Sequence, residues 1–195
     1  ALKNRLKSFR KKERDCSMKI GVNIGKNKTT PNEKAVDDYV KCFEELYELA
    51  DFFIVNVSSP NTPNLRELQN KDELLKILNA LISIRSEREV WKPIYLKIAP
   101  DLTLTQLDEI ITLQKVISFE GIVATNTSID RTLLKKSNHK IVSELGNGGI
   151  SGHILLDASN RIVRYIREKS DMTIIGVGGI EDEASAKSKL EAGAN

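Results

Sequence analysis

The chain has 195 residues, of which 40% are hydrophobic, a length and composition that fit one packed domain or part of a larger one. Thirty basic and 27 acidic residues give a formal net charge of +3, too small an excess for general nucleic-acid binding to follow from charge. No apolar run is long enough to span a bilayer, and no signal-peptide pattern is present. The isolated cysteines Cys16 and Cys42 lack C-x-x-C spacing, which indicates a reducing compartment and argues against a zinc site.

The positive charge is concentrated near the start of the chain, in a stretch that can form a basic surface helix. Its basic residues are Lys3, Arg5, Lys7, Arg10, Lys11, Lys12 and Arg14. A solvated helix face explains such a stretch, and contact with acidic lipid headgroups or nucleic acid is the alternative. The chain begins without methionine and ends just after a helical pattern that stops at Gly193, so we interpret it as a piece of a longer protein.

Short apolar runs, each followed by a stretch with helical periodicity, predict alternating strands and helices. The predicted strands are 19–25, 52–57, 94–99, 119–124 and 173–177. The first helix is expected to start at a capping box formed by Thr30 and Glu33 around Pro31. Asn70 with Glu73, and Thr103 with Gln106, are expected to open the next two helices, and 155–169 and 181–192 supply two more.

Strict alternation of strand and helix, without hairpin signals, predicts a parallel sheet with helices outside it. Two architectures fit, a (β/α)₈ TIM barrel and an open doubly wound sheet. A barrel places its active site at the carboxyl ends of many strands, whereas an open sheet concentrates it at one switch point. Polar residues follow several successive strands here, which favours the barrel. About five β/α units are visible where eight are required, so the barrel is incomplete in this chain.

The segment 52–66 runs from an apolar strand directly into a loop rich in amides and hydroxyls. Pro60 and Pro63 fix two φ angles and stiffen this loop. Its neutral donors and acceptors are Asn56, Ser58, Ser59, Asn61 and Thr62. Alone, the segment is typical of any polar strand-to-helix loop; beside the polar residues that follow the other strands, it indicates a ligand pocket.

Two further strand ends carry polar side chains. Lys97 lies near the end of an apolar strand, and a buried ammonium group is costly unless it meets an anion. It suits either a Schiff-base nucleophile or a fixed cation that stabilises negative charge on a cofactor or substrate. The triplet 125–127 (TNT) closes the next strand. Several amides and hydroxyls around one pocket suit a planar ligand such as a pyrimidine or a flavin ring.

Glycines cluster near the end of the chain. They are Gly146, Gly148, Gly149, Gly152, Gly176, Gly178 and Gly179. The run 176–179 after a strand allows backbone N–H groups to approach a phosphate. His139 and His153 stand beside no serine that they would activate, so both are expected to be structural or exposed.

Together these residues resemble the dihydroorotate dehydrogenases, specifically the class 2, quinone-dependent branch. The resemblance covers nearly all of 19–195. Its motifs are 21–28 (GVNIGKNK), 56–63 (NVSSPNTP), 96–103 (LKIAPDLT), 125–127 (TNT), 148–152 (GGISG) and 176–179 (GVGG).

The resemblance implies a (β/α)₈ barrel that holds FMN and oxidises (S)-dihydroorotate to orotate in pyrimidine synthesis. Ser59 matches the base that removes the C5 proton while hydride passes from C6 to the flavin. A serine hydroxyl is a poor base alone, so Thr62 with an ordered water is the expected proton relay. Class 1 enzymes carry cysteine at this position, and serine therefore indicates class 2, with ubiquinone or menaquinone as electron acceptor.

The remaining roles also follow from the resemblance. Flavin contacts match Asn23, Asn56, Lys97 and Thr125, and the backbone at Gly152 and Gly179 matches close approaches to FMN. Orotate contacts match Asn56, Asn61, Asn126 and Thr127. Lys97 would lie near the N1/O2 edge of the flavin, where its charge favours the anionic reduced form, so the resemblance disfavours the Schiff-base interpretation. No metal is expected.

Two departures from the family pattern are visible. Asn64 stands where many relatives have glycine, and we expect asparagine to keep the left-handed turn. The family's N-terminal membrane helices, first strands and last strand are absent, so 1–195 is expected to be a partial FMN-binding domain that binds FMN poorly alone. Peripheral membrane association is expected through the absent segments, on the cytoplasmic face of a bacterial membrane or, alternatively, on the mitochondrial inner membrane.

Two other functions remain open at this point. One is a related flavin barrel of class 1 or of the dihydropyrimidine dehydrogenase type, which would use fumarate or a nicotinamide in place of a quinone. The other is a non-catalytic anion-binding module that uses the basic segment 3–14.

Overall fold

The structure, a computed structural model, describes residues 2–13, 17–134 and 148–195, so Cys16, His139 and Gly146 lie outside the described residues. The helices are α1 (Leu2–Lys12), α2 (Ala35–Leu46), α3 (Lys71–Ser86), α4 (Leu104–Val116), α6 (Leu156–Lys169) and α7 (Glu183–Glu191). The strands are β1 (Gly21–Ile24), β2 (Phe52–Asn56), β3 (Ile94–Ile98), β4 (Gly121–Ala124) and β5 (Thr173–Gly176). Each strand lies inside a predicted apolar run, which confirms the predicted alternation.

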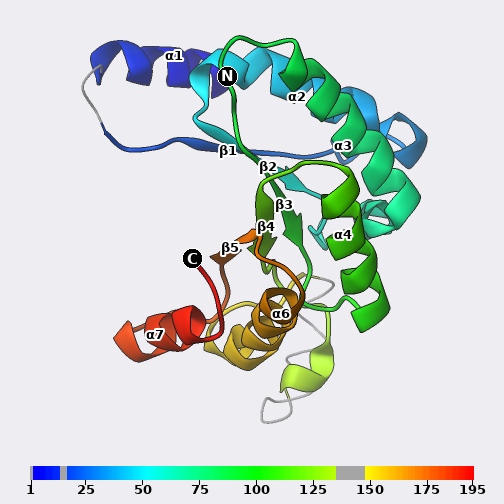
Figure 1. Cartoon of the computed structure of the whole chain (residues 1–195), viewed down its shortest axis with the longest axis vertical. Helices are drawn as coiled ribbons and strands as arrows, with labels where there is room; N and C mark the ends of the chain where they lie inside the picture. Colours follow the sequence, from blue (N-terminus) through cyan, green and yellow to red (C-terminus); the bar gives the residue numbers. More distant parts are fainter. Residues whose placement is uncertain (1, 14–16, 135–147) are drawn as a thin grey trace.

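Within the described residues, five parallel strands form one sheet in the order β1-β2-β3-β4-β5. Spatial order therefore follows chain order, and every crossover moves in the same direction. Since crossovers between parallel strands are right-handed, this order places all the connecting helices on one side of the sheet. Figure 1 shows the helices gathered along that side. The arrangement is an arc of a β/α barrel, because a doubly wound sheet would reverse its strand order.

The two faces of the sheet differ in chemistry. One face is fully buried under the helices and forms the core; its members include Val22, Ile24, Phe53, Val55, Leu96, Ile98, Ile122 and Ile174. On the other face, Phe52 meets Tyr95 edge to face with 5.8 Å between ring centroids. Asn56 pairs in register with Lys97 on that same face. Alternation along the strands thus aims apolar side chains at the helices and places Asn56 and Lys97 side by side inside the arc.

The predicted helix starts have different outcomes. At α4 the capping box is confirmed: Gln106 N donates to Thr103 Oγ1 at 3.3 Å, and Thr103 N donates to Gln106 Oε1 at 3.0 Å. Asn70 is the N-cap residue of α3, although its side chain makes no capping bond. The box at Thr30 and Glu33 is wrong.

The segment before α2 is instead held from other residues. The chain passes through a 3₁₀ turn at Asn32–Lys34, and no side chain caps the turn or the helix that follows at Ala35. Lys26 Nζ donates to the carbonyl oxygen of Thr30 at 2.5 Å, and Asp38 accepts from Asn27 N at 2.8 Å. These two bonds fix the loop, so a Thr30 cap is not needed.

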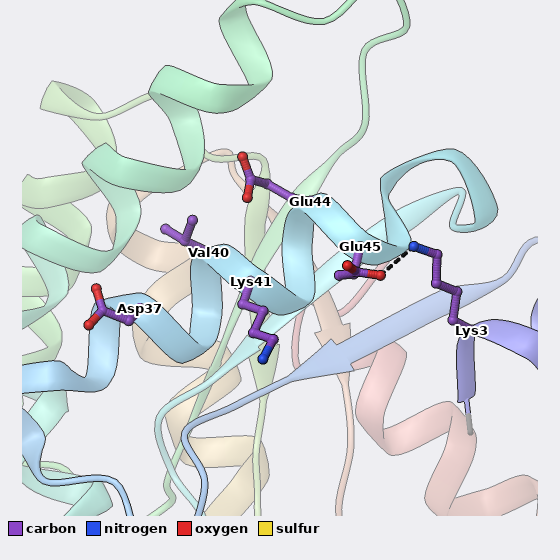
Figure 2. A pocket seen from close by; sticks show the side chains of 6 residues that line it. All are labelled: Lys3, Asp37, Val40, Lys41, Glu44 and Glu45. Carbon is purple, nitrogen blue, oxygen red and sulfur yellow. Dashed lines mark hydrogen bonds and ion pairs between the residues drawn. The ribbon is translucent and has the colours of Figure 1, made fainter.

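Helix α1 forms on the basic stretch, as predicted, and carries no buried residue. Figure 2 shows Lys3 of α1 paired with Glu45 of α2, beside a hollow lined by side chains of these two helices. Arg10 Nη2 donates to Asp51 Oδ2 at 2.6 Å, and Arg10 Nε donates to Leu49 O at 3.1 Å. Part of the basic charge is therefore used to attach α1 to its own chain. Among the described helices, none is both long and apolar enough to cross a membrane.

A buried ion pair joins α3 to the amino ends of β3 and β4. Arg85 is fully buried, and its Nη1 lies 2.8 Å from Glu120 Oε2. The same carboxylate accepts from Ile94 N at 2.7 Å and from Trp91 Nε1 at 3.1 Å. Arg85 Nη2 donates to Ser118 O at 2.6 Å. The two charges thus compensate each other within the protein, and Arg85 Nε is the one buried guanidinium nitrogen of the described residues without a hydrogen bond.

Candidate active site

Side-chain amides at the carboxyl ends of β2 and β4 form one hydrogen-bonded cluster. Asn56 Oδ1 accepts from Ser58 Oγ at 3.0 Å and from Ser58 N at 3.2 Å. Asn126 Nδ2 donates to Ser58 Oγ at 3.0 Å, and Asn126 Oδ1 accepts from Thr127 N at 2.8 Å. The structure therefore brings Asn56, Asn126 and Thr127 together, as predicted, and adds the buried Ser58 as their link.

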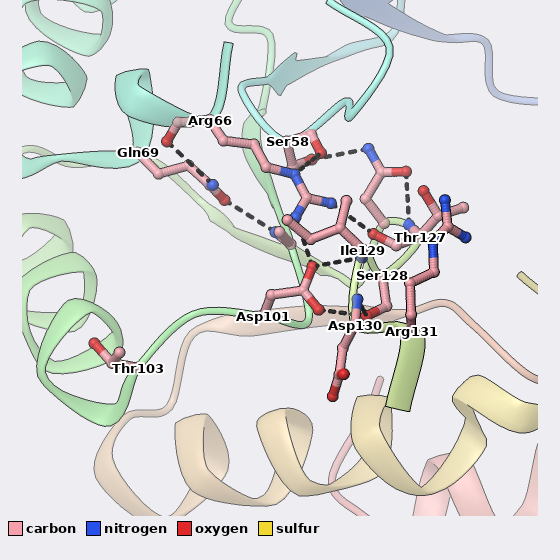
Figure 3. A network of polar contacts seen from close by, with 12 residues as sticks. Ser58, Arg66, Gln69, Asp101, Thr103, Thr127, Ser128, Ile129, Asp130 and Arg131 are labelled. Carbon is pink, nitrogen blue, oxygen red and sulfur yellow. Dashed lines mark hydrogen bonds and ion pairs between the residues drawn. The ribbon is translucent and has the colours of Figure 1, made fainter. Parts of the chain in front are cut away.

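Arg66 joins three strand ends, as Figure 3 shows. Its Nε donates to Ser58 O at 3.2 Å, Nη2 donates to Thr127 O at 2.8 Å, and Nη1 lies 2.6 Å from Asp101 Oδ2. Asp101 also accepts from Ser128 Oγ and from Ile129 N. A planar guanidinium group suits this role because it presents several donors in a fixed geometry. Sequence reasoning missed Arg66 and Asp101.

The loop that carries Ser59 extends from this cluster. Ser59 Oγ is half-buried and accepts from Asn61 N at 3.3 Å. Asn61 is exposed and Thr62 is half-buried. Asn64 has φ 57°, so it keeps the left-handed conformation that was predicted for it. The proton relay between Ser59 and Thr62 stays a prediction.

The segment 148–150 crosses over the same loop. Ile150 pairs with Ser128 in an antiparallel bridge, with N···O distances of 2.7 and 3.1 Å. A Cβ atom on Gly149 would overlap Thr127 Oγ1 and lie 2.9 Å from Pro60 Cγ. Glycine at this position therefore allows the segment to pack directly on Thr127 and Pro60, which connects the β2 and β4 loops.

Three predicted cofactor-binding side chains lack protein partners. Lys97 is half-buried, and burial lowers the pKa of its ammonium group. Among the described residues, no carboxylate pairs with Lys97 and no hydrogen bond satisfies it. Thr125 is 1% exposed, and its Oγ1 has no hydrogen-bond partner. Asn23 is exposed on the inner face of β1. Unsatisfied buried polar groups are uncommon in proteins, so Thr125 Oγ1, with Lys97 and Asn23 on the inner face of the sheet, indicates a ligand position.

A glycine turn follows β5 and meets the start of α6. Gly152, Gly178 and Gly179 have φ angles of 95°, 107° and 78°, which favour glycine. A Cβ atom on Gly179 would lie 2.5 Å from Leu156 N at the first turn of α6. Backbone near a helix N-terminus attracts anions.

His153, in this region, is exposed, with Nδ1 3.0 Å from Glu181 Oε1. No group of three or more His, Cys, Asp and Glu side chains in the described ranges could hold a metal ion.

The predicted site residues thus divide into two groups. Asn56, Asn126 and Thr127 form a self-supported cluster of neutral groups. Lys97 and Thr125 lie beside it with unused hydrogen-bonding capacity, and the glycine turn lies beyond Thr125. A planar polar ring with an anionic tail fits this chemistry. Together, fold and site define a β/α-barrel protein with a ligand site at the carboxyl ends of its strands.

Comparison with known proteins identifies the family. The family Dihydroorotate dehydrogenase matches residues 1–195. The dihydroorotate dehydrogenase (quinone) of Christiangramia forsetii is 48% identical over 194 residues, and the alignment covers 98% of this chain and 54% of that protein. The protein of the same name from Nostoc punctiforme is 44% identical over 193 residues, with 95% and 50% covered.

Solved structures agree. Ligand-free DHODH from Eimeria tenella matches with a TM-score of 0.88 and 32% identity, over 98% of this chain and 57% of that chain. The complex of DHODH from Eimeria tenella with ferulenol matches with a TM-score of 0.85 and 31% identity, over 99% and 55%. The chain belongs to the dihydroorotate dehydrogenase family, whose members use a flavin. It spans about half the length of the curated relatives it matches.

Proposed function

We propose that the protein containing this chain is a quinone-dependent dihydroorotate dehydrogenase. It would oxidise (S)-dihydroorotate to orotate in de novo pyrimidine synthesis, with FMN as cofactor and ubiquinone or menaquinone as electron acceptor. Relatives at 48% and 44% identity carry the name dihydroorotate dehydrogenase (quinone). The observation that carries the proposal is the unpartnered Lys97 and Thr125 beside the Asn56–Asn126 cluster.

The residues present fit FMN. The buried hydroxyl of Thr125 lacks a partner, and Lys97 offers an uncompensated cation to the electron-rich edge of a ring. Asn23 and Asn56 supply amides on the same inner face, Gly152 has open space where a side chain would begin, and Gly179 brings the turn against the first residue of α6. When bound, FMN supplies the hydride acceptor. The role of this chain is to hold it and to place positive charge near its ring.

Substrate handling belongs to the neutral cluster and its loop. Asn56, Asn61, Asn126 and Thr127 would bind dihydroorotate through its amide and carboxylate groups. Ser59 Oγ would remove the C5 proton, with Thr62 passing the proton onward through water. Arg66 supports this arrangement, because it bonds the carbonyl oxygens of Ser58 and Thr127 and so ties together the β2 and β4 loops that carry the proposed substrate contacts.

Residues 1–195 would then form part of an FMN-binding (β/α)₈ domain. We propose that the whole protein is peripheral to the cytoplasmic face of a bacterial membrane, with the mitochondrial inner membrane as the alternative. Membrane contact would come from segments outside this chain. Measuring which acceptor reoxidises the reduced complete enzyme tests this assignment, since a class 1 relative would use fumarate or a nicotinamide rather than a quinone.

The base is tested by Ser59→Ala in the complete enzyme. Flavin reduction by dihydroorotate should slow by about 100-fold or more, the range of general base catalysis, while quinone oxidation of the reduced flavin stays near normal. Stopped-flow absorbance separates the two half-reactions. Ser83→Ala, on the exposed face of α3, is the matched control and should leave both rates unchanged. An equal loss of rate in both half-reactions would contradict the assignment of Ser59 as the base.

A further inference from the structure

We propose that Lys189 is a buried cation beneath the glycine turn at 176–179 and that its charge strengthens binding of the phosphate end of the flavin. This inference rests on the proposed function and adds to it a residue that contacts neither the ring nor the substrate. Lys189 would act through space as a positioning residue for the anionic group.

Lys189 belongs to α7 and reaches the loop that follows β5 through one serine. It is 2% exposed, and its Nζ donates to Ser159 Oγ at 2.7 Å. Ser159, which is fully buried in α6, donates to Val177 O at 2.6 Å. Val177 O also accepts from Thr125 N at 2.8 Å. Two hydrogen bonds therefore separate the ammonium group from the backbone that leads into Gly178 and Gly179.

The glycines show how closely this side chain packs under the turn. A Cβ atom on Gly176 would lie 2.5 Å from Lys189 Cγ and 2.8 Å from its Cδ, so the stem of Lys189 occupies that space. A Cβ atom on Gly178 would lie 3.5 Å from Ser159 Oγ and 3.7 Å from the unpartnered Thr125 Oγ1. Thr125, Gly178 and Ser159 thus lie close together, and the ammonium group of Lys189 contacts this region through Ser159 Oγ.

The charge of Lys189 is not compensated by the described residues. Burial, together with the positive charge of Arg164 on α6, lowers its pKa to about 8. Strands β4 and β5 carry no titratable side chain, and no described carboxylate pairs with Lys189. A buried ammonium group without an anion is costly, and an apolar side chain could fill the same space beside Gly176.

An anion at the glycine turn would offset this cost. The turn already lies against the first residues of α6, where backbone N–H groups and the helix dipole favour negative charge. A phosphate bound there would meet the positive potential of Lys189 through Ser159 and Gly178. Lys189 therefore acts on the phosphate of the cofactor, whereas Lys97 and Asn56 contact its ring.

The test compares two flavins on the complete protein, freed of cofactor. Lys189→Gln keeps a donor for Ser159 and removes the charge. Titrations followed by flavin fluorescence should show FMN binding about 10- to 30-fold weaker, as expected for charges several ångström apart at an effective dielectric constant of about 20. Riboflavin, which lacks the phosphate, should bind the variant as it binds the unmodified protein. Lys187→Gln is the matched control, because Lys187 is on the same helix with its side chain 75% exposed.

Equal weakening of both flavins, or no change in either, would overturn the role of Lys189. A second measurement needs no variant: in the unmodified protein, the ratio of FMN to riboflavin affinity should fall as the pH rises above about 8, because Lys189 loses its proton there. A constant ratio through pH 9.5 would also overturn it. Failure of the unmodified protein to bind either flavin would instead contradict the proposed function itself.

Discussion

The two ends of the sheet differ in how their charges are compensated: the carboxyl end has the pair Arg66–Asp101 but also cations without a carboxylate partner among the described residues. At the amino end, Arg85 meets Glu120, and Arg10 meets Asp51, with backbone N–H groups completing each carboxylate. At the carboxyl end, Lys97 and Lys189 have no carboxylate partner among the described residues, and Thr125 Oγ1 has no hydrogen bond.

This difference separates residues that hold the fold from residues that await a ligand. A buried charge that has its partner is tolerated in the fold. Removing the partner leaves the other charge buried and unpaired, which lowers the free energy of unfolding. An uncompensated group lowers the stability of the free protein and is satisfied only when something binds. In a β/α barrel the ligand end is the carboxyl end of the strands, which is where Lys97, Thr125 and the Nζ of Lys189 lie.

The largest expected effect is at the amino end. Glu120→Ala leaves the fully buried Arg85 without its carboxylate, so the free energy of unfolding should fall by about 3–5 kcal/mol. Chemical denaturation of the complete protein measures this change. Glu89→Ala, at an exposed position before β3, should cost almost nothing. A loss below about 1 kcal/mol for Glu120→Ala would show that the pair is not a stabilising contact.

At the carboxyl end we expect a smaller effect, in which ligand affinity falls while stability is kept or rises. Thr125→Val removes the unpartnered hydroxyl, so unfolding free energy should stay the same or rise by up to about 1 kcal/mol, while flavin affinity falls about 5- to 10-fold. Chemical denaturation measures the free energy of unfolding, and flavin titration measures the affinity. Thr103→Val is the contrasting control: it removes the cap of α4, so it should cost about 1 kcal/mol of stability without changing flavin affinity. Destabilisation by Thr125→Val would mean that the hydroxyl already has a partner.

The smallest effect is a pH dependence at the amino end. Burial alone raises the pKa of Asp51, but hydrogen bonds from Ile20 N and Arg10, with the charge of Arg10, outweigh it and hold the pKa below the ordinary value of 3.8. Since the folded state binds this proton less tightly than the unfolded state, the contribution of Asp51 is present above pH 3.8 and is lost as the pH falls below it.

We therefore expect Asp51→Asn to cost about 1 kcal/mol or less at pH 6 and progressively less toward pH 3. Denaturation curves of both proteins across this range measure the difference. A difference that stays constant down to pH 3 would show that the ionisation of Asp51 contributes nothing.

Much of the fold was predictable because its signals are local. Apolar periodicity located all five described strands, and the Thr103–Gln106 box depends on residues three positions apart. The left-handed turn at Asn64 followed from the residue type alone. The failed box at Thr30 shows the limit, because Lys26 and Asp38 hold this loop through other backbone groups, the Thr30 carbonyl and the Asn27 N–H.

The site was predictable only in part, and for the same reason. Strand ends revealed Asn56, Lys97 and Thr125, but the order of residues does not reveal contacts between distant segments. Arg66 follows a turn and looks like an ordinary exposed charge until it meets Thr127 O. In the sequence Lys189 resembles Lys187, two positions earlier on the same helix, and only packing against Gly176 and Ser159 distinguishes them.

The contacts of Arg66 also bear on the order of events during folding. Its bonds to Asp101 and Thr127 join residues 35 and 61 positions apart, so the entropy of closing long loops must be overcome before they form. Pairing of β2 with β3, and of β3 with β4, has to come first. We therefore expect the pocket to acquire its geometry late, after the helices and the core have assembled, and to be the first part of the protein to lose hydrogen-exchange protection under mild denaturant.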